Sequence, residues 1–270
     1  MPYMLYERYP AGHYAIFTMN RPDRLNAQGA VMREELTSAL AEFTRDPEMR
    51  VGIVTGAGRA FSAGADLREM AERDAAGNQE DQARLAEMPP EVRMEGLRQG
   101  QPFSRNPKPF IAAVNGLAMA GGLELILACD LVIAAESARI GDGHSKFGLL
   151  PGGGASVRLP RVVGRTRALE MFFTAELYPA GEMRDWGLVN EVVPDDQLDE
   201  TTSRLAAQLA SRSPLGLTRM KKLVNETADQ PTATALSLEL LYSMLHEKSH
   251  DMSEGVAAFV EKREPRFTGN

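Results

Sequence analysis

The sequence predicts an α/β fold, in which strands alternate with helices, followed by a helical region at its C-terminal end. Two observations predict this arrangement. In residues 1–195, short apolar runs of strand length alternate with longer segments whose apolar residues recur at helical spacing. From residue 196 onward, only the helical spacing is present. We therefore expect residues 1–195 to form a core that carries the functional site and residues 196–270 to form a helical C-terminal region.

The elements of the predicted core follow from local patterns. Residues 3–9 and 14–19 alternate apolar and polar side chains around Ala11-Gly12, which predicts a β-hairpin. Residues 29–43 predict a helix whose buried face carries Val31, Leu36, Leu40 and Phe43. The remaining expected elements are strands over 51–55, 110–114, 131–135, 138–140 and 191–193, and helices from about residue 67, over 123–129 and over 159–174.

Two core segments and the C-terminal region have their own signatures. Residues 56–67 are rich in glycine and alanine and predict a loop. Residues 72–106 are rich in Glu, Arg, Gln and Ala, with few large apolar side chains, which predicts a partly helical flap outside the core. Beyond residue 195 we expect four helices, over 198–212, 215–229, 233–245 and 253–262, separated by Ser213-Pro214, Gln230-Pro231 and Asp251.

Composition and charge limit the classes of function. The chain has 270 residues, of which 43% are hydrophobic and 25% are charged, as in an ordinary globular protein. Its net charge of −7 argues against nonspecific binding to nucleic acid or to an anionic membrane. The single cysteine, Cys129, excludes an internal disulfide, and no apolar run reaches the length of a membrane span. The N-terminal residues lack the pattern of a signal peptide, so we expect a cytoplasmic protein.

The stretch 113–130 carries the strongest chemical signal. Gly121-Gly122 precedes an apolar segment that predicts a buried helix, and Glu124 is the one ionisable group in its first turn. Backbone N–H groups at a helix N-terminus have no intrahelical acceptor and lie at the positive end of the dipole, which suits a developing negative oxygen. A buried carboxylate one turn away is placed to move protons on the same ligand. The alternative is that Glu124 only complements the helix dipole.

Two further stretches are candidates for the same site. Small residues before an acid, in Ser62-Ala63-Gly64-Ala65-Asp66, indicate a close approach of the backbone to a ligand, or a helix cap formed by Asp66. The glycine-rich residues 141–154 contain His144, which is either a catalytic group or an ordinary loop histidine.

Two familiar motifs match in residue spacing, but the residues around them do not support the function of either motif. His246 and His250 have the H-E-x-x-H spacing of zinc peptidases, but a helix break predicted at Asp251 and the lack of a supported third ligand argue against it. Gly56-Ala57-Gly58 follows a strand as a dinucleotide-binding loop does, but Phe61 occupies the position of the third glycine. We therefore expect no metal site and no dinucleotide cofactor.

Six segments, in this order, resemble the crotonase (enoyl-CoA hydratase/isomerase) superfamily. They are NRPDRLNA (20–27), GRAFSAGADL (58–67), AVNGLAMAGGLELILACD (113–130), FGLLPGGGASVRLPRVVG (147–164), LYPAGEMRDWGLVNEVV (177–193) and EGVAAFVEKREPRF (254–267). The resemblance implies a crotonase-like (ClpP/crotonase) spiral of repeated ββα units with a helical C-terminal trimerisation region, assembled as a homotrimer or a dimer of trimers. It also implies an acyl-CoA thioester as substrate, with no cofactor beyond the CoA that the substrate carries.

The resemblance also implies roles for individual residues. The oxyanion hole falls on the backbone N–H groups of Ala65 and Gly121. Of the two glutamates that face the substrate in hydratases of the superfamily, the first falls on Glu124, and the second falls on His144, which departs from the pattern. The residues implied for CoA binding are Arg24, Leu25, Ala27, Ala63, Asp66, Leu67 and Arg68, together with Phe259 and Lys262 of the last helix, which often serve a neighbouring subunit.

The leading hypothesis is therefore the hydration of a 2-enoyl-CoA through an enolate held in the oxyanion hole, with Glu124 and His144 moving the protons. One alternative is an enoyl-CoA isomerase. Another is a retro-Claisen C–C hydrolase, a branch that pairs its histidine with an aspartate at the position occupied here by Gly153. A third is a homologue that binds acyl-CoA without catalysis.

Overall fold

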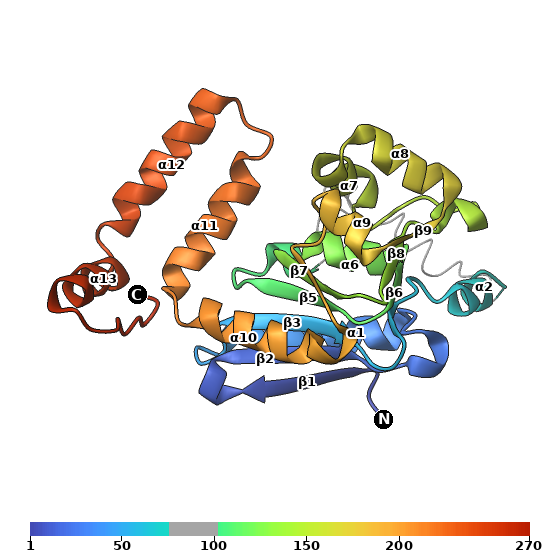
Figure 1. Ribbon diagram of the computed structural model, residues 1–270, viewed down its shortest axis with the longest axis horizontal. Helices are drawn as coiled ribbons and strands as arrows, with labels where there is room; N and C mark the ends of the chain where they lie inside the picture. Colours follow the sequence, from blue (N-terminus) through green and yellow to red (C-terminus); the bar gives the residue numbers. More distant parts are fainter. Residues whose placement is uncertain (76–101) are drawn as a thin grey trace.

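Two β-sheets form the body of the molecule, and helices surround them (Figure 1). The computed structural model describes residues 1–75 and 102–270. The first sheet has the strand order β1-β2-β3-β5-β7-β10, and the second has the order β4-β6-β8-β9. The strands of the first sheet are β1 (Met4–Tyr9), β2 (Tyr14–Met19), β3 (Val51–Gly56), β5 (Phe110–Val114), β7 (Leu131–Ala135) and β10 (Glu191–Val193). Those of the second sheet are β4 (Ala60–Ser62), β6 (Leu117–Met119), β8 (Arg139–Gly141) and β9 (Leu177–Pro179).

The chain repeats a unit of two strands and a helix. Strands β3, β5 and β7 lie side by side and parallel in the first sheet, and the strand that follows each of them, β4, β6 or β8, enters the second sheet. Helices α2 (Leu67–Ala75), α6 (Gly121–Ala128) and α7 (Ala155–Val163) follow the three strand pairs. This arrangement confirms the α/β fold and the ββα spiral that the resemblance implied.

An aromatic cluster lies at the centre of the core. Helix α1 (Ala30–Arg45) packs on β1 and β2, and α10 (Leu198–Ala210) packs on β3. Neighbouring rings of Phe17, Phe43, Phe103 and Phe110 have centroids between 4.8 and 5.5 Å apart. Phe103 belongs to α5 (Pro102–Arg105) and is fully buried, so the expectation that residues 72–106 lie outside the core is wrong at this point. The greater part of that expected flap, 76–101, lies outside the described residues.

Several local expectations are confirmed, and the differences have simple causes. The β1–β2 hairpin pairs antiparallel as expected. Helix α1 buries Met32 and leaves Val31 52% exposed, because Val31 lies five residues before Leu36 and so about 140° away around the helix. The helix expected over 159–174 is two helices, α7 and α8 (Arg165–Thr174), which meet at Gly164 with a φ of +86°. The strands β4, β6 and β9 were not predicted, whereas β8 and β10, of the same length, were. Strand β4 lies within residues 56–67, whose glycine and alanine content predicted a loop.

The last three helices continue beyond the sheets. They are α11 (Pro214–Thr227), α12 (Thr232–His246) and α13 (His250–Glu261), preceded in the core by the short α9 (Ala180–Asp185). Helices α11 and α12 form an antiparallel pair that extends away from the body (Figure 1). Lys221 anchors α11, because its Nζ donates to Asp130 Oδ2 at 2.7 Å and to the carbonyl oxygen of Phe103 at 2.9 Å. The domain boundary near residue 195 stays a prediction, since α10 packs on the sheet. No helix in the described ranges could span a bilayer.

Candidate active site

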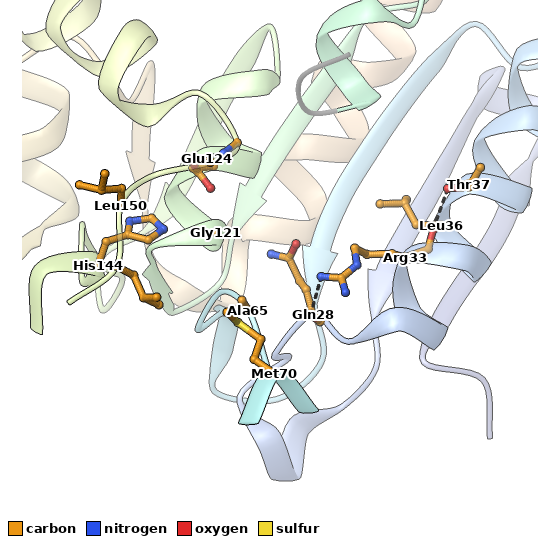
Figure 2. Close-up of a pocket in the computed structure, with 13 residues that line it drawn as sticks. Gln28, Arg33, Leu36, Thr37, Ala65, Met70, Gly121, Glu124, His144 and Leu150 are labelled. Carbon is orange, nitrogen blue, oxygen red and sulfur yellow. Dashed lines mark hydrogen bonds between the residues drawn. The ribbon is translucent and has the colours of Figure 1, made fainter. Parts of the chain in front are cut away.

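A cavity of about 500 Å³ lies where helix α6 begins. The four residues that the sequence assigned to the oxyanion hole and to proton transfer line it, namely Ala65, Gly121, Glu124 and His144. The other lining residues come from the segment before α1, from α1 and α2, and from the loop before α7, namely Gln28, Arg33, Leu36, Thr37, Met70, Leu149, Leu150, Gly152 and Gly153. Figure 2 shows Glu124 and His144 on one side of the cavity, with Arg33 and Thr37 of α1 on the other.

The loop that carries Ala65 is held by hydrogen bonds on two sides. Gln28 N donates to Gly64 O at 2.7 Å, and Asp66 N donates to Gln28 O at 3.3 Å, so residues 28 and 65 pair as a parallel bridge. The buried Ser62 hydroxyl accepts from Gln28 Nε2 at 3.1 Å and donates to Asn26 O at 2.9 Å. Within the described part of the chain, the Ala65 amide has no acceptor. The loop therefore presents that amide in a fixed direction.

Helix α6 begins directly against this loop because glycine allows the contact. A β-carbon at Gly122 would lie 2.2 Å from Ser62 O, and one at Gly121 would lie 3.5 Å from Ala65 N. Ala120, just before the helix, has φ +51° and ψ −112°, a conformation that L residues rarely adopt and that directs the amide following it. The amides of residues 65 and 121 thus lie close together at the positive end of α6. Two backbone amides that lie close together at a helix N-terminus are candidates for binding a negative oxygen.

Glu124 is buried, and one of its carboxylate oxygens is fully engaged. The residue is 4% exposed, and its Oε1 accepts hydrogen bonds from Gly153 N at 2.6 Å and Ala155 N at 3.2 Å. Arg158 Nη1 donates to Gly153 O at 3.0 Å, so Gly153 is held from both sides. Burial lowers the pKa of the Arg158 guanidinium, and the negative Glu124 carboxylate opposes that change. Oε2, for which the described residues supply no donor, is the oxygen available to a ligand.

His144 is oriented by an aspartate that sequence reasoning missed. Its Nδ1 lies 2.8 Å from Asp142 Oδ2, and its backbone N donates to Asp142 Oδ1 at 3.0 Å. The hydrogen bond to Asp142 raises the pKa of His144 above its usual value; burial opposes the increase, and the negative charges of Asp142 and Glu124 add to it. With Nδ1 engaged by Asp142, Nε2 is the ring nitrogen left for the cavity that His144 lines.

The residues predicted to bind CoA fall into two groups. Arg24, Leu25, Ala27, Ala63, Asp66, Leu67 and Arg68 are brought together by two neighbouring loops and the first turn of α2. Ala63 N donates to Leu25 O at 2.9 Å, which joins the loops directly. Asp66 caps α2 by accepting from Arg68 N at 3.2 Å and pairs with Arg21 at 3.0 Å, so its side chain makes internal contacts.

Phe259 and Lys262 are not brought to the cavity in one chain. Phe259 is 85% exposed on α13, and Lys262 follows the last turn of that helix. Helix α13 lies at the opposite end of the molecule from α2 (Figure 1). Their predicted role at the CoA therefore requires a neighbouring subunit.

Three site residues were not identified from the sequence. Asp142 lies two residues before His144, and this short spacing was the available signal. Gln28 and Arg21 lie at or beside the quoted segment 20–27, but their roles depend on contacts with residues 62–66, far along the chain. Gly153, where the C–C hydrolase hypothesis requires an aspartate, contributes its backbone amide to Glu124.

The two histidines with zinc-peptidase spacing belong to different helices. His246 ends α12 and contacts Arg219, whereas His250 begins α13 and contacts Thr268. Asp251 and Gly255 lie inside α13, so the expected break at Asp251 is wrong; the chain breaks before His250. Across residues 1–75 and 102–270, no three His, Cys, Asp or Glu side chains gather as metal ligands.

Comparison with known proteins extends the likeness to nearly the whole chain. A family model described as enoyl-CoA hydratase/isomerase matches residues 12–270. A 1,2-epoxyphenylacetyl-CoA isomerase of Escherichia coli (strain K12) is 39% identical over 256 residues, which cover 93% of this chain and 94% of that protein. A 2,3-dehydroadipyl-CoA hydratase of the same strain is 36% identical over 254 residues, which cover 94% of each protein. The crystal structure of an enoyl-CoA hydratase from Bacillus anthracis is 33% identical, with a TM-score of 0.85 over 99% of this chain and 100% of that chain.

Proposed function

This chain belongs to the enoyl-CoA hydratase/isomerase family, and from that premise we propose that it adds water across the double bond of a 2-enoyl-CoA thioester. It is an enzyme of the crotonase superfamily. The observation that carries the proposal is the placement of the Glu124 carboxylate in one cavity with the amides of Ala65 and Gly121. Relatives named as hydratases support the same reaction.

In the proposed reaction the two amides bind the thioester oxygen while negative charge develops on it. Glu124 accepts a proton from water, and the hydroxide oxygen forms a bond to C3 of the acyl group. His144, protonated at Nε2, donates a proton to C2, so that water is added and a 3-hydroxyacyl-CoA results. Each amide of such a site stabilises the transition state by about 2.7–4 kcal/mol. The carboxylate returns its proton to His144 through solvent before the next turnover.

The test is turnover of defined substrates. The protein should convert crotonyl-CoA or a longer 2-enoyl-CoA to a product heavier by one water, and in ¹⁸O-labelled water the label should appear at C3. Loss of the double-bond absorbance gives the rate, and mass spectrometry gives the product. If these thioesters bind in calorimetry without turnover of any of them, the hydratase proposal is wrong and a non-catalytic acyl-CoA-binding role is supported instead.

Isomerisation is the second candidate, favoured by the pair of proton-transfer groups on one side of the cavity. A group that removes a proton from C2 of a 3-enoyl-CoA and a group that returns it at C4 would shift the double bond through the same enolate. The relative named as a 1,2-epoxyphenylacetyl-CoA isomerase supports an isomerase as the alternative. Incubation with 3-enoyl-CoA distinguishes the two, because an isomerase produces 2-enoyl-CoA with no change in mass.

The remaining parts of the proposal concern what binds around this chemistry. Arg24, Leu25, Ala27 and Arg68 are proposed to line the CoA nucleotide and pantetheine, as the superfamily resemblance implies. The reaction uses only protein groups, water and the substrate thioester, so we propose that no cofactor takes part. The cytoplasmic location expected from the sequence stays a prediction.

We also propose that the chain assembles as a homotrimer, or as a dimer of trimers, through its C-terminal helices. Support comes from large apolar side chains that are exposed along α11, α12 and α13, namely Met220, Val224, Leu236, Leu240, Leu241, Met244, Leu245, Val256, Phe259 and Val260. So many exposed apolar side chains on neighbouring helices are costly in a monomer and typical of an obligate interface. A neighbouring copy would also bring Phe259 and Lys262 to the CoA.

Sedimentation equilibrium checks the assembly. The wild-type mass should be three or six times that of the chain, and Leu240→Glu should lower it, because a charge would be buried in the interface. Val31→Glu is the control, since Val31 is also an exposed apolar residue, at 52% against 63% for Leu240, but lies on α1. A monomeric wild type contradicts the assembly, and an unchanged mass in Leu240→Glu contradicts an interface formed by the C-terminal helices.

A further inference from the structure

Asp142 is a buried carboxylate whose contacts are directed at one residue. It is 1% exposed and follows strand β8 directly. In the described chain its two oxygens have a single partner residue, His144: Oδ1 accepts the backbone N–H, and Oδ2 lies 2.8 Å from the ring Nδ1. A buried carboxylate costs free energy unless both of its oxygens accept hydrogen bonds. Because His144 supplies both of these contacts, a change in the position of either side chain would leave a buried oxygen without a donor.

The contact determines which ring nitrogen reaches the ligand. An ionised carboxylate is only an acceptor, so Nδ1 must carry a proton to bind it. In the neutral ring the lone pair is then on Nε2, and in the charged ring Nε2 carries the second proton. The Asp142 side chain and backbone contacts together fix the direction in which Nε2 faces the cavity that His144 lines (Figure 2).

We propose that Asp142 is a positioning residue, which holds the His144 ring in one tautomer and orientation so that Nε2 exchanges protons with the acyl-CoA ligand. The proposal rests on the proposed function, since it assumes a substrate in this cavity. It assigns to the Asp142–His144 pair the task that a second glutamate performs in hydratases of the superfamily. Asp142 does not touch the ligand and acts only through the imidazole.

The pH profile follows from the charges around the ring. The charged groups acting on His144 are Asp142 from the turn after β8 and Glu124 from α6, while Arg33 of α1 lies on the other side of the cavity. The hydrogen bond to Asp142 is the largest contribution that raises the pKa of His144. Asp142→Asn removes it, so the His144 limb of the kcat/KM profile should move to lower pH. The direction is the same whether the ring acts as acid or as base.

A double-mutant cycle tests whether Asp142 acts through His144. His144→Ala should lower kcat by about 10²- to 10⁴-fold, which is the usual contribution of a general acid or base. Asp142→Asn should lower kcat by roughly 10-fold or more with a smaller change in KM. In the His144→Ala background, Asp142→Asn should change kcat less than about 3-fold, since the ring that it orients is gone. Equal effects in both backgrounds would overturn the proposal.

Histidine NMR makes the test independent of the reaction. The chain has four histidines, so the ¹⁵N signals of His144 are identified by their absence in His144→Ala. Wild type should show the Nδ1-protonated tautomer, and Asp142→Asn should change the tautomer and lower the titration midpoint. If no thioester is turned over but these signals behave as stated, the proposed function fails and the Asp142–His144 assignment stands. Unchanged signals in Asp142→Asn overturn the assignment even if hydration is observed.

Asp251→Asn is the matched control for loss of a buried carboxylate. Asp251 is also 1% exposed, and it accepts from Thr268 N, Gly269 N and the Ser213 hydroxyl, in the α13 region remote from His144. This variant should lose stability without moving the pH limb or the His144 signals. A shift of the limb of the same size in Asp251→Asn would show that the effect is not specific to Asp142, and would overturn the proposal.

Discussion

Glu124→Gln should lower kcat for 2-enoyl-CoA hydration by about 10²- to 10⁴-fold while leaving acyl-CoA affinity within a few-fold of wild type. The glutamine carbonyl oxygen can keep the hydrogen bonds that Glu124 Oε1 accepts from Gly153 N and Ala155 N. Its amide nitrogen then occupies the position of Oε2, where it is a donor and cannot accept a proton from water. The measurements are kcat and KM from initial rates, together with the thermal midpoint of unfolding.

Glu35→Gln is the matched control for this substitution. Glu35 Oε2 also accepts from two backbone amides, Tyr3 N at 2.7 Å and Met4 N at 2.8 Å, but it lies outside the residues that line the cavity. The Glu35→Gln variant should lower the thermal midpoint by a small amount, as Glu124→Gln does, and should leave kcat unchanged. Turnover by Glu124→Gln at the wild-type rate would remove the carboxylate from the mechanism.

Gly64→Ala should lower kcat by about 10²- to 10³-fold, the size expected when one oxyanion-hole donor is lost. A β-carbon at this position would lie 2.8 Å from Gly121 N and 3.0 Å from Met119 O, and both are backbone atoms that cannot move aside cheaply. Gly64 also has a φ of +92°, so alanine is strained there. The loop must therefore shift relative to α6, which separates the amides of Ala65 and Gly121. Initial rates and urea unfolding provide the two readouts.

Gly164→Ala is the control that distinguishes the effect of backbone strain from the effect of separating the amides of Ala65 and Gly121. Gly164 has a φ of +86°, and a β-carbon there would have no neighbour within 4 Å, so the variant carries the backbone strain alone. Gly164 has a ψ of 153°, in the extended region that essentially only glycine adopts, so the variant should be destabilised by about 1–3 kcal/mol with kcat unchanged. If Gly64→Ala retains wild-type kcat although its stability falls, the two amides do not form the site that binds the thioester oxygen.

Local sequence patterns predicted a large part of this fold because the responsible interactions are local. The β1–β2 hairpin, helix α1 and the buried strands β3, β5 and β7 follow from periodicity and turn residues that lie within each segment. Residues 121–124 likewise predicted the start of a helix with a buried acid, because two glycines precede a glutamate in an apolar segment. Helix α6 begins at Gly121, and Glu124 is buried in its first turn. The strands β4, β6 and β9 were missed, although β8 and β10, which are equally short, were predicted. The break between α7 and α8 was missed because Gly164 interrupts an otherwise helical pattern.

The sequence by itself determined the fold class, the family resemblance and the identity of the residues proposed for chemistry, since each depends on residue types in order along the chain. Only the tertiary structure decided how those residues meet. The contact of Gly64 with Gly121, the engagement of Glu124 Oε1 by the turn at Gly153, and the burial of Phe103 all join segments that are distant in sequence. Asp142 lies only two residues from its partner His144, but this contact too depends on the tertiary structure. Its pairing with His144 depends on a turn after β8 whose burial no local pattern reveals, because burial is set by what packs around the segment.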